Sequence, residues 1–317
     1  MNWQRKRVMV TGGAGFIGSH LSESLIELGA DLRIIDLPKR ESRLKGTSLE
    51  DVAFSGIDVS DVGALKSTGF KPEYLFHLAA FAIPQECEID RELAYKRNVQ
   101  GTFNALDFAK RNDVEKVIFP SSAQLYGIYP KYLPIDENHP VDTANSFYNY
   151  TKKLGEENCT FFWEKQALPV LFFRLFNSFG ERQAKNYFIP SVIIQALNGK
   201  KVEIWSDKPT RDFTYVKDTV NALIKGAESK YSPGPINIGY GKEIKIGDLA
   251  RQIATSLDSE LINKDIPVTG SMRMLCDNTR AAQLLNWKPE TTFEQGLERT
   301  INWYRENKHL YLNPNLS

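Results

Sequence analysis

Residues 8–18 read VMVTGGAGFIG, and this stretch decides how the chain is expected to fold. Three spaced glycines, Gly12, Gly15 and Gly18, directly follow an apolar strand pattern and open a helical one. One glycine permits a tight turn, one lets the backbone approach a pyrophosphate, and one lets helix and strand pack closely. The N-terminus of the helix would offer free N–H groups and a positive dipole end to the phosphates. The stretch therefore predicts a dinucleotide-binding loop, and a glycine-rich turn without a ligand is the alternative.

Beyond this loop, short apolar runs alternate with segments of helical period, as in consecutive βαβ units. Such units bury parallel strands between two layers of helices. The expected fold class is therefore α/β, a Rossmann-type doubly wound parallel sheet. Its predicted strands are 7–11, 31–36, 52–59, 74–80, 116–122, 168–177 and 235–241, with helices over 14–30, 98–113 and 292–307.

The rhythm changes near residue 178, where segments become shorter and Pro or Gly interrupts them often. We expect residues 1–177 to form the dinucleotide-binding Rossmann domain, with 235–255 returning to it. Residues 178–234 and 256–317 are expected to form a smaller, discontinuous C-terminal lobe that binds the substrate.

An acidic residue, Asp36, closes the predicted strand 31–36 at the distance where a carboxylate accepts hydrogen bonds from the adenosine ribose. A carboxylate there disfavours a 2′-phosphate and so favours NAD over NADP, although Lys39 and Arg40 follow closely. Asp58, which ends the third predicted strand, is a second candidate near the expected place of the adenine. Turn capping by Asp36 and helix N-capping by Asp58 are the alternatives.

Composition excludes several classes of function. The net charge of +1 over 317 residues gives no reason to expect nucleic acid or a membrane surface as a partner. Three scattered cysteines without a CxxC pair, and only four histidines, argue against a metal site and for free thiols in a reducing compartment. The chain shows neither a signal-peptide pattern nor an apolar run of about 18 residues. A soluble, cytoplasmic protein is expected.

Residues 144–154, ANSFYNYTKKL, hold a tyrosine four residues ahead of a lysine. On a helix, Tyr148 and Lys152 lie on one face, one turn apart. Tyr150 points to another side of the helix, where packing is its expected role, and Lys153 reads as a surface charge. The pair is either an exposed surface pair or a proton-transfer device, and the phosphate loop upstream favours the device.

Taken together, the motifs resemble a known family. TGGAGFIG, HLAA (77–80), NVQGT (98–102), SSAQLYG (121–127), Y-x-x-x-K, RLFNSFG (174–180) and RDFTYVKD (211–218) occur in that order. This series resembles the extended short-chain dehydrogenase/reductase family, specifically its nucleotide-sugar epimerases and dehydratases, over nearly the whole chain. The resemblance implies NAD as cofactor, a nucleotide sugar as substrate and no metal.

The resemblance also implies roles for individual residues. In the family, the tyrosine takes the proton of a sugar hydroxyl, commonly at C4, while the same carbon gives hydride to NAD. A free tyrosine has a pKa of about 10, so a nearby ammonium and the nicotinamide ring are expected to lower it. The implied catalytic residues are Ser122, Tyr148 and Lys152; the cofactor-binding ones are Gly12, Gly15, Phe16, Ile17, Gly18, Asp36, Asp58, Val59, Leu78, Ala79, Ala80, Asn98, Tyr148 and Lys152; the substrate-binding ones are Gln124, Asn177, Phe188, Ser191, Arg211 and Arg273.

The residues after Ser122 bear on the reaction. Sugar-nucleotide 4,6-dehydratases of the family resemble T-D-E or T-S-E here, where acids manage deprotonation at C5 and loss of the C6 hydroxyl. This chain has Ala123 and Gln124, and a glutamine neither gives nor takes a proton at neutral pH. We therefore expect an NAD-dependent 4-epimerase that passes through a transient 4-keto sugar. A 4,6-dehydratase, a 4-keto-sugar reductase, a decarboxylase or another epimerase, and a non-catalytic dinucleotide-binding regulator, are the alternatives.

Two further expectations concern the substrate and the assembly. Several 4-epimerases resemble R-P-G-D near the C-terminus, which this chain lacks, so Arg273 is the nearby candidate for the diphosphate, against a surface role. Trp205 is a candidate to stack on the base, against a place in the core. Family members commonly dimerise through two helices, here those around 98–112 and 148–165, so a homodimer is expected; burial against the chain's own sheet is the alternative.

Overall fold

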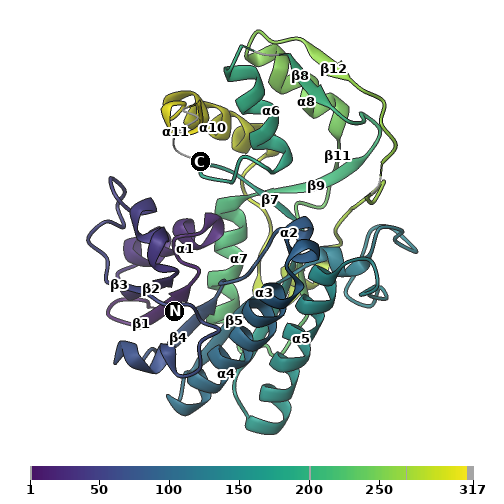
Figure 1. The fold of residues 1–317 in the computed structure, drawn as a ribbon. Helices are drawn as coiled ribbons and strands as arrows, with labels where there is room; N and C mark the ends of the chain where they lie inside the picture. Colours follow the sequence, from purple (N-terminus) through teal and green to yellow (C-terminus); the bar gives the residue numbers. More distant parts are fainter. Residues whose placement is uncertain (1, 200, 269, 313–317) are drawn as a thin grey trace.

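A computed structural model describes residues 2–199, 201–268 and 270–312 of the chain. Its centre is a seven-stranded sheet in which each neighbouring pair is parallel, in the order β10-β6-β5-β4-β1-β2-β3 (Figure 1). The strands are β1 (Arg7–Thr11), β2 (Asp31–Asp36), β3 (Phe54–Gly56), β4 (Tyr74–His77), β5 (Lys116–Ser122), β6 (Val170–Leu175) and β10 (Ile236–Ile238). The predicted doubly wound sheet is confirmed.

Alternating side chains of the strands bury both faces of this sheet. In β1, Val8 and Val10 belong to one apolar core and Met9 to the other. One face is covered by α1 (Phe16–Glu27), α7 (Val216–Glu228) and α9 (Thr279–Leu285). The other is covered by α4 (Gly101–Arg111) and α5 (Phe147–Gln166), which lie side by side. Period-2 burial on two faces is what a sheet between two helical layers requires.

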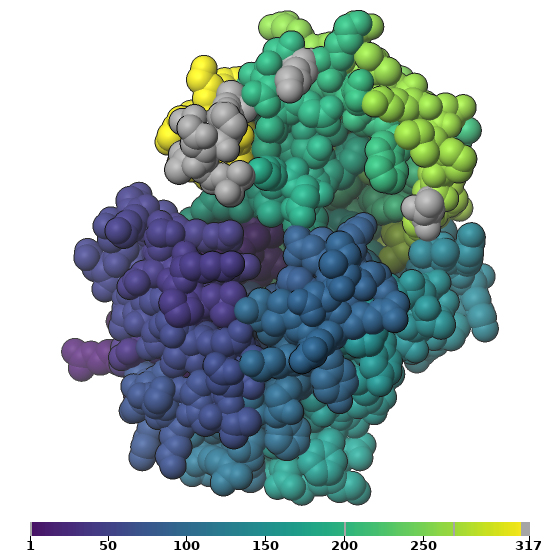
Figure 2. Space-filling view, in the orientation of Figure 1, coloured from purple at the N-terminus to yellow at the C-terminus, as the bar shows by residue number. Residues whose placement is uncertain are grey.

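A smaller lobe has an apolar core of its own above the C-terminal ends of the strands (Figure 1). Its helices are α6 (Phe188–Leu197), α8 (Ile246–Ser256), α10 (Phe293–Glu306) and α11 (His309–Leu312). Its strands are β7 (Asn177–Phe179), β8 (Val202–Ile204), β9 (Thr210–Tyr215), β11 (Glu243–Lys245) and β12 (Leu261–Asn263), in sheets β11-β9-β7 and β12-β8. Figure 2 shows the surface hollowed where the two lobes meet.

The remaining helices are short. They are α2 (Pro84–Ile89), α3 (Arg91–Tyr95), a π-helical turn (Lys96–Gln100) and 3-10 turns at Pro38–Arg43, Ala64–Thr68 and Ala123–Tyr126. The predicted helix 98–113 is therefore α4 preceded by a π-turn. Among the described residues, no helix combines the length and the apolar character needed to cross a bilayer.

The packing differs from the predicted lobe limits in two helices. The sequence rhythm assigns α7 to the smaller lobe, but its Val220 and Leu223 are buried with Leu171 of the central sheet. It assigns α8 to the sheet, but Leu249 and Ile253 are buried in the core of the smaller lobe. The physical reason is that a buried stripe shows that a helix is covered, and only the tertiary structure shows what covers it.

Candidate active site

The glycine loop lies in close contact with the end of β4. A Cβ added at Gly12 would come within 2.7 Å of the main chain of Leu78 and Ala79, and one at Gly18 within 2.1 Å of the Gly12 oxygen. Gly15 is the residue before α1, and no side chain caps this helix. Its first N–H groups are thus available to an anion. The loop and the open helix end fit a pyrophosphate, with Phe16 and Ile17 in the first turn.

Asp36 ends β2 beside this loop. Its carboxylate accepts hydrogen bonds from the N–H groups of Ala14 (3.1 Å) and Leu37 (2.8 Å), and Arg40 Nε lies 3.6 Å from Oδ1. Burial raises its pKa, and the Arg40 guanidinium opposes that shift. A buried carboxylate with spare lone pairs at this place fits the ribose hydroxyls of a dinucleotide.

Asp58 has more partners in the protein than the prediction foresaw. Its carboxylate accepts from the Ser60 N–H (3.0 Å) and hydroxyl (2.6 Å), and pairs with Arg97 Nε at 3.0 Å. Burial raises its pKa, but these bonds outweigh burial and the net shift is downward. These bonds cap a turn and not a helix, because the next helical segment begins only at Ala64, and contact of Asp58 and its neighbour Val59 with adenine stays a prediction.

Asn98, predicted to touch the cofactor, is engaged with the chain. Its Oδ1 accepts from Phe81 N (2.7 Å), and its Nδ2 donates to Phe81 O and to Thr151 Oγ1, both at 3.0 Å. The amide therefore ties the segment after β4, which includes Leu78, Ala79 and Ala80, to α5. We propose that Asn98 acts on the cofactor through this segment.

The structure brings Ser122, Tyr148 and Lys152 together at the C-terminal end of β5. Only 8%, 7% and 6% of these residues, respectively, is exposed. The Ser122 side chain acts directly on the Tyr148 hydroxyl and, against the effect of burial, acts to lower its pKa. Lys152 Nζ donates to Pro120 O at 2.7 Å and lies 4.7 Å from the centre of the Phe119 ring.

The other two residues of the quoted stretch face elsewhere. Tyr150 is 43% exposed, and Lys153 pairs with Glu157 at 2.8 Å. The prediction for Lys153 is confirmed. Tyr150 is not packed inside the chain, because its side of α5 lies on the surface.

Burial dominates the electrostatics of the pair. It raises the pKa of Tyr148, with further upward contributions from Tyr187 and Cys87, while Ser122 opposes. It lowers the pKa of Lys152 to about 8, against the influence of Cys159, Glu156 and Cys87. An apolar pocket disfavours either charged form, and the lowering of the tyrosine pKa by the nicotinamide ring stays a prediction.

Arg211 and Arg273, the two candidates for the diphosphate, differ sharply. Arg211 is half-buried on β9, and its Nη1 donates to Thr210 O at 2.8 Å. Within the described ranges, no carboxylate lies within ion-pair distance of it. Arg273 instead forms a two-pronged ion pair with Glu243, whose Oε1 is 2.9 Å from Nε. A half-buried guanidinium without a counter-charge suits a phosphate, so we propose Arg211 for that role.

The remaining predicted substrate residues come from the turn after β5 and from the smaller lobe. Gln124 is exposed, and its main-chain oxygen accepts from Asn149 Nδ2 at 2.7 Å. Asn177, on β7, is exposed and donates to Asp212 O at 3.2 Å. Phe188 begins α6, and Ser191 Oγ accepts from Gln195 at 3.3 Å. Trp205 is 67% exposed, so it is not a core residue.

Two residues near Tyr148 were not predicted. Tyr187, just before α6, and Cys87, on α2, both act on the Tyr148 pKa. Cys87 is fully buried and its thiol donates to Phe81 O at 3.2 Å. Tyr187 directly precedes Phe188, a predicted substrate residue, and this is the signal that could have found it; no sequence signal pointed to Cys87.

The chain resembles proteins of known family in sequence and structure. The family model described as "NAD dependent epimerase/dehydratase family" matches residues 8–239. A putative UDP-glucose 4-epimerase of Methanocaldococcus jannaschii is 32% identical, over 95% of this chain and 99% of that protein. A UDP-N-acetyl-alpha-D-glucosaminuronate decarboxylase of Bacillus cytotoxicus is also 32% identical, over 95% and 98%.

A solved structure agrees with these sequence matches. The UDP-N-acetylglucosamine 4-epimerase of Methanobrevibacter ruminantium, in complex with UDP-N-acetylmuramic acid, superimposes with a TM-score of 0.87 at 30% identity, over 96% of this chain and 99% of that one. With the glycine loop, Asp36 and the Ser122–Tyr148–Lys152 group in place, the chain belongs to the NAD-dependent epimerase/dehydratase family, the nucleotide-sugar group of the extended short-chain dehydrogenases/reductases, and its cofactor is NAD.

Proposed function

We propose that the protein is a nucleotide-sugar 4-epimerase. The observation that carries this proposal is the exposed, uncharged Gln124 two residues after Ser122, at the place where a dehydratase would need an acid. Ala123, beside it, is buried and has no proton to exchange. The two 4-epimerases among the relatives described above support the proposal, and the decarboxylase relative keeps that reaction as the second candidate.

The chain's own residues would manage the protons and the position of the sugar. NAD, when bound, supplies a reversible hydride acceptor. Tyr148 would take the proton of the C4 hydroxyl and later return it to the oxygen of the other epimer. Ser122 would hold that oxygen, and Lys152 would supply the cation that favours the ionised tyrosine. Because burial raises the pKa of Tyr148, this step needs Lys152 in its charged form.

Incubation in D₂O tests the reaction. We expect the wild-type protein to interconvert the C4 epimers of one nucleotide sugar among UDP-, GDP-, CDP- and dTDP-linked candidates. Since C5 keeps its hydrogen during C4 hydride transfer, the product should carry no carbon-bound deuterium, as read by NMR and mass spectrometry. Deuterium at C5 together with absorbance typical of a 4-keto product in alkali would indicate a dehydratase, deuterium at C5 without it a 5-epimerase, and deuterium at C5 with released CO₂ a decarboxylase.

Replacing each arginine by methionine should separate the two diphosphate candidates. Arg211→Met is expected to raise KM for the nucleotide sugar by roughly 10- to 100-fold, because a charge-assisted hydrogen bond contributes about 1.5–3 kcal/mol. Arg273→Met is the matched control and should change KM less than about fivefold, because an exposed ion pair is worth about 0–1 kcal/mol. Steady-state kinetics measures both, and the reverse order would assign the diphosphate to Arg273.

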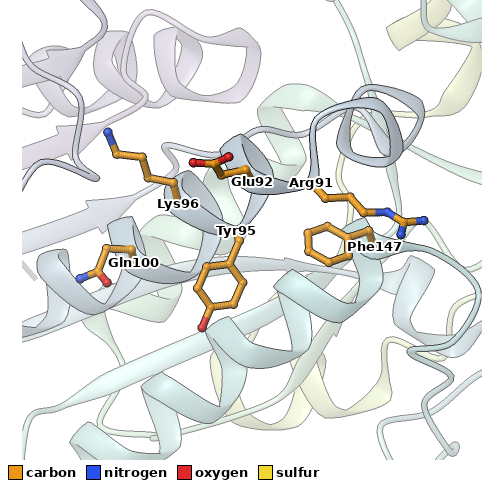
Figure 3. A pocket seen from close by; sticks show the side chains of 6 residues that line it. All are labelled: Arg91, Glu92, Tyr95, Lys96, Gln100 and Phe147. Carbon is orange, nitrogen blue, oxygen red and sulfur yellow. The ribbon is translucent and has the colours of Figure 1, made fainter.

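We also propose a homodimer through an aromatic patch on α3, α4 and α5. Tyr95, Phe103, Tyr150 and Phe161 are each between 42% and 49% exposed. An adjoining groove of about 470 Å³ shares Tyr95 and is lined also by Arg91, Glu92, Lys96, Gln100 and Phe147 (Figure 3). None of the six belongs to the predicted catalytic or binding residues. An apolar patch of this kind is typical of a contact surface.

Sedimentation tests the dimer. The wild-type protein should sediment at about twice the chain mass of 36.0 kDa. Phe103→Glu with Phe161→Glu should give a single-chain species, because two charges would then have to be buried. Val62→Glu is the control, since Val62 is 86% exposed and lies outside the patch. A wild-type mass of one chain would reject the dimer.

We further propose a cytoplasmic location, which suits the buried free thiols of all three cysteines. Fractionation of cells tests this location.

A further inference from the structure

Three consecutive residues at the end of β5 are each bound to α5. Pro120 O accepts from Lys152, Ser121 Oγ donates to Glu156 Oε1 at 2.7 Å, and Ser122 interacts with Tyr148. Positions 148, 152 and 156 are one turn apart, so the three contacts follow one face of the helix. Only the middle contact, between Ser121 and Glu156, joins two side chains that have no proposed role in the reaction.

Glu156 is almost completely buried, with 1% of the residue exposed, and its charge is matched by Arg174 on β6. Arg174 Nε donates to Oε1 at 2.9 Å and Nη2 to Oε2 at 2.8 Å. The sheet register places Arg174 directly beside Ser121. Arg174 also lies 5.0 Å from the centre of the Tyr126 ring. Strand β5, strand β6 and helix α5 therefore meet at one carboxylate.

A buried ion pair is a costly way to gain stability. Desolvation of the two charges often cancels their attraction, and apolar side chains of similar size do as well or better. Such a pair does fix geometry, because its two-pronged hydrogen bonds tolerate little displacement. Here the geometry concerns the distance between the end of β5 and the face of α5. Gly155 makes this close approach possible, since a Cβ there would lie 2.7 Å from the Phe119 ring.

The negative charge of Glu156 also acts to raise the pKa of Lys152. Burial favours the neutral amine, while Glu156 and Cys159 on α5 and Cys87 on α2 favour the ammonium. Burial, and to a smaller extent the charge of Lys152, lowers the pKa of His77 on β4 to about 3, so this side chain is neutral. If Glu156 lost its charge, the buried guanidinium of Arg174 would remain without the counter-charge that Glu156 supplies.

We propose that Glu156, held by Arg174, is a positioning residue that acts through Ser121 and Lys152 to hold the catalytic group in its reactive arrangement. The proposal rests on the proposed oxidation at C4, and it would hold for any reaction of the family that begins with that step. Glu156 is almost fully buried and its carboxylate is bound by Ser121 and Arg174, so we expect it to touch neither substrate nor cofactor. Its effect should therefore appear in kcat and in the pH profile, and not in KM.

Ser121→Ala is the first test, because it removes one hydrogen bond and leaves the ion pair whole. We expect kcat to fall roughly 10- to 100-fold, the size of effect that a small misplacement of reacting groups has, with KM and NAD affinity unchanged. Ser121→Thr, which keeps the hydroxyl, should restore most of the rate. A Ser121→Ala protein with wild-type kcat would overturn the proposal.

Glu156→Gln is the second test, with pH as the readout. Without the anion, Lys152 should lose its proton at lower pH, so the alkaline limb of the kcat profile should move to lower pH. The control is Glu23→Gln, which breaks a similar two-pronged pair between Glu23 on α1 and Arg182 at 2.6 and 2.7 Å, with neither residue on β5 or α5. That variant is expected to lose stability and to keep the wild-type profile; equal shifts in both variants would contradict the proposal.

The measurements distinguish an unfolded variant, a wrong proposed function and a wrong positioning role from one another. Thermal unfolding and NAD titration show first whether a variant is folded, and if Glu156→Gln is not, Ser121→Ala decides alone. A wild-type protein inactive on each nucleotide sugar tried would contradict the proposed function. An active wild type with unaffected variants would contradict only the positioning role.

Discussion

Replacing Tyr148 by phenylalanine is expected to lower kcat by roughly 10²–10⁴-fold, the usual contribution of a general acid–base group. The change removes the hydroxyl that would exchange a proton with the sugar and leaves the ring, which is 7% exposed, in its packing. Binding of NAD and of the nucleotide sugar should persist. The measurement is epimer interconversion at saturating substrate, together with the reduction of bound NAD by the sugar.

Tyr150→Phe is the matched control for this variant. It removes a hydroxyl from the same helix, but from a side chain that is 43% exposed and faces away from Ser122. We expect wild-type turnover. If Tyr148→Phe also kept its biological activity, the non-catalytic dinucleotide-binding regulator would become the better account.

Gly12→Ala is expected to abolish measurable NAD binding and to destabilise the fold by about 1–3 kcal/mol. Gly12 has a φ of +72°, and its added Cβ would come within 2.7 Å of the backbone of Leu78 and Ala79. Main-chain atoms cannot turn aside as a side chain can, so the loop or the end of β4 must move, and both belong to the predicted cofactor site. Calorimetric titration with NAD and chemical unfolding measure the two effects.

Gly63→Ala is the control for Gly12→Ala, because it tests the effect of the left-handed backbone conformation without a steric contact. Gly63 has nearly the same φ, +76°, but nothing lies within 4 Å of an added Cβ. The Gly63→Ala protein should lose about 1–2 kcal/mol of stability, because alanine disfavours the left-handed conformation. It should keep full NAD affinity. Equal affinity for NAD in both variants would show that the close approach of loop and strand is not needed for binding.

The parts of the fold that depend on local pattern were predictable from the sequence. Strands β1 and β5 have the predicted limits, because continuous apolar runs between turn residues mark buried strands. The shared face of Tyr148 and Lys152 follows from helical spacing alone. Such features can be predicted from residues that are close together in the sequence.

Features that depend on distant contacts were not predictable. Burial raises the pKa of Tyr148 and so opposes the expected shift, and burial is a property of the whole pocket. Arg273 forms its ion pair with Glu243, which lies 30 residues away in the chain. Glu156 and Arg174 stand 18 residues apart with nothing in the local pattern to join them. Their meeting depends on the order of strands in the sheet.

The most direct test of the central claim follows one hydrogen atom. A nucleotide sugar that carries deuterium at C4 should, with the wild-type protein, be converted to its C4 epimer with the deuterium still on C4, because the hydride leaves and returns to the same carbon. Loss of that deuterium to solvent, its appearance at C6, or inversion at a carbon other than C4 would contradict the assignment as a 4-epimerase.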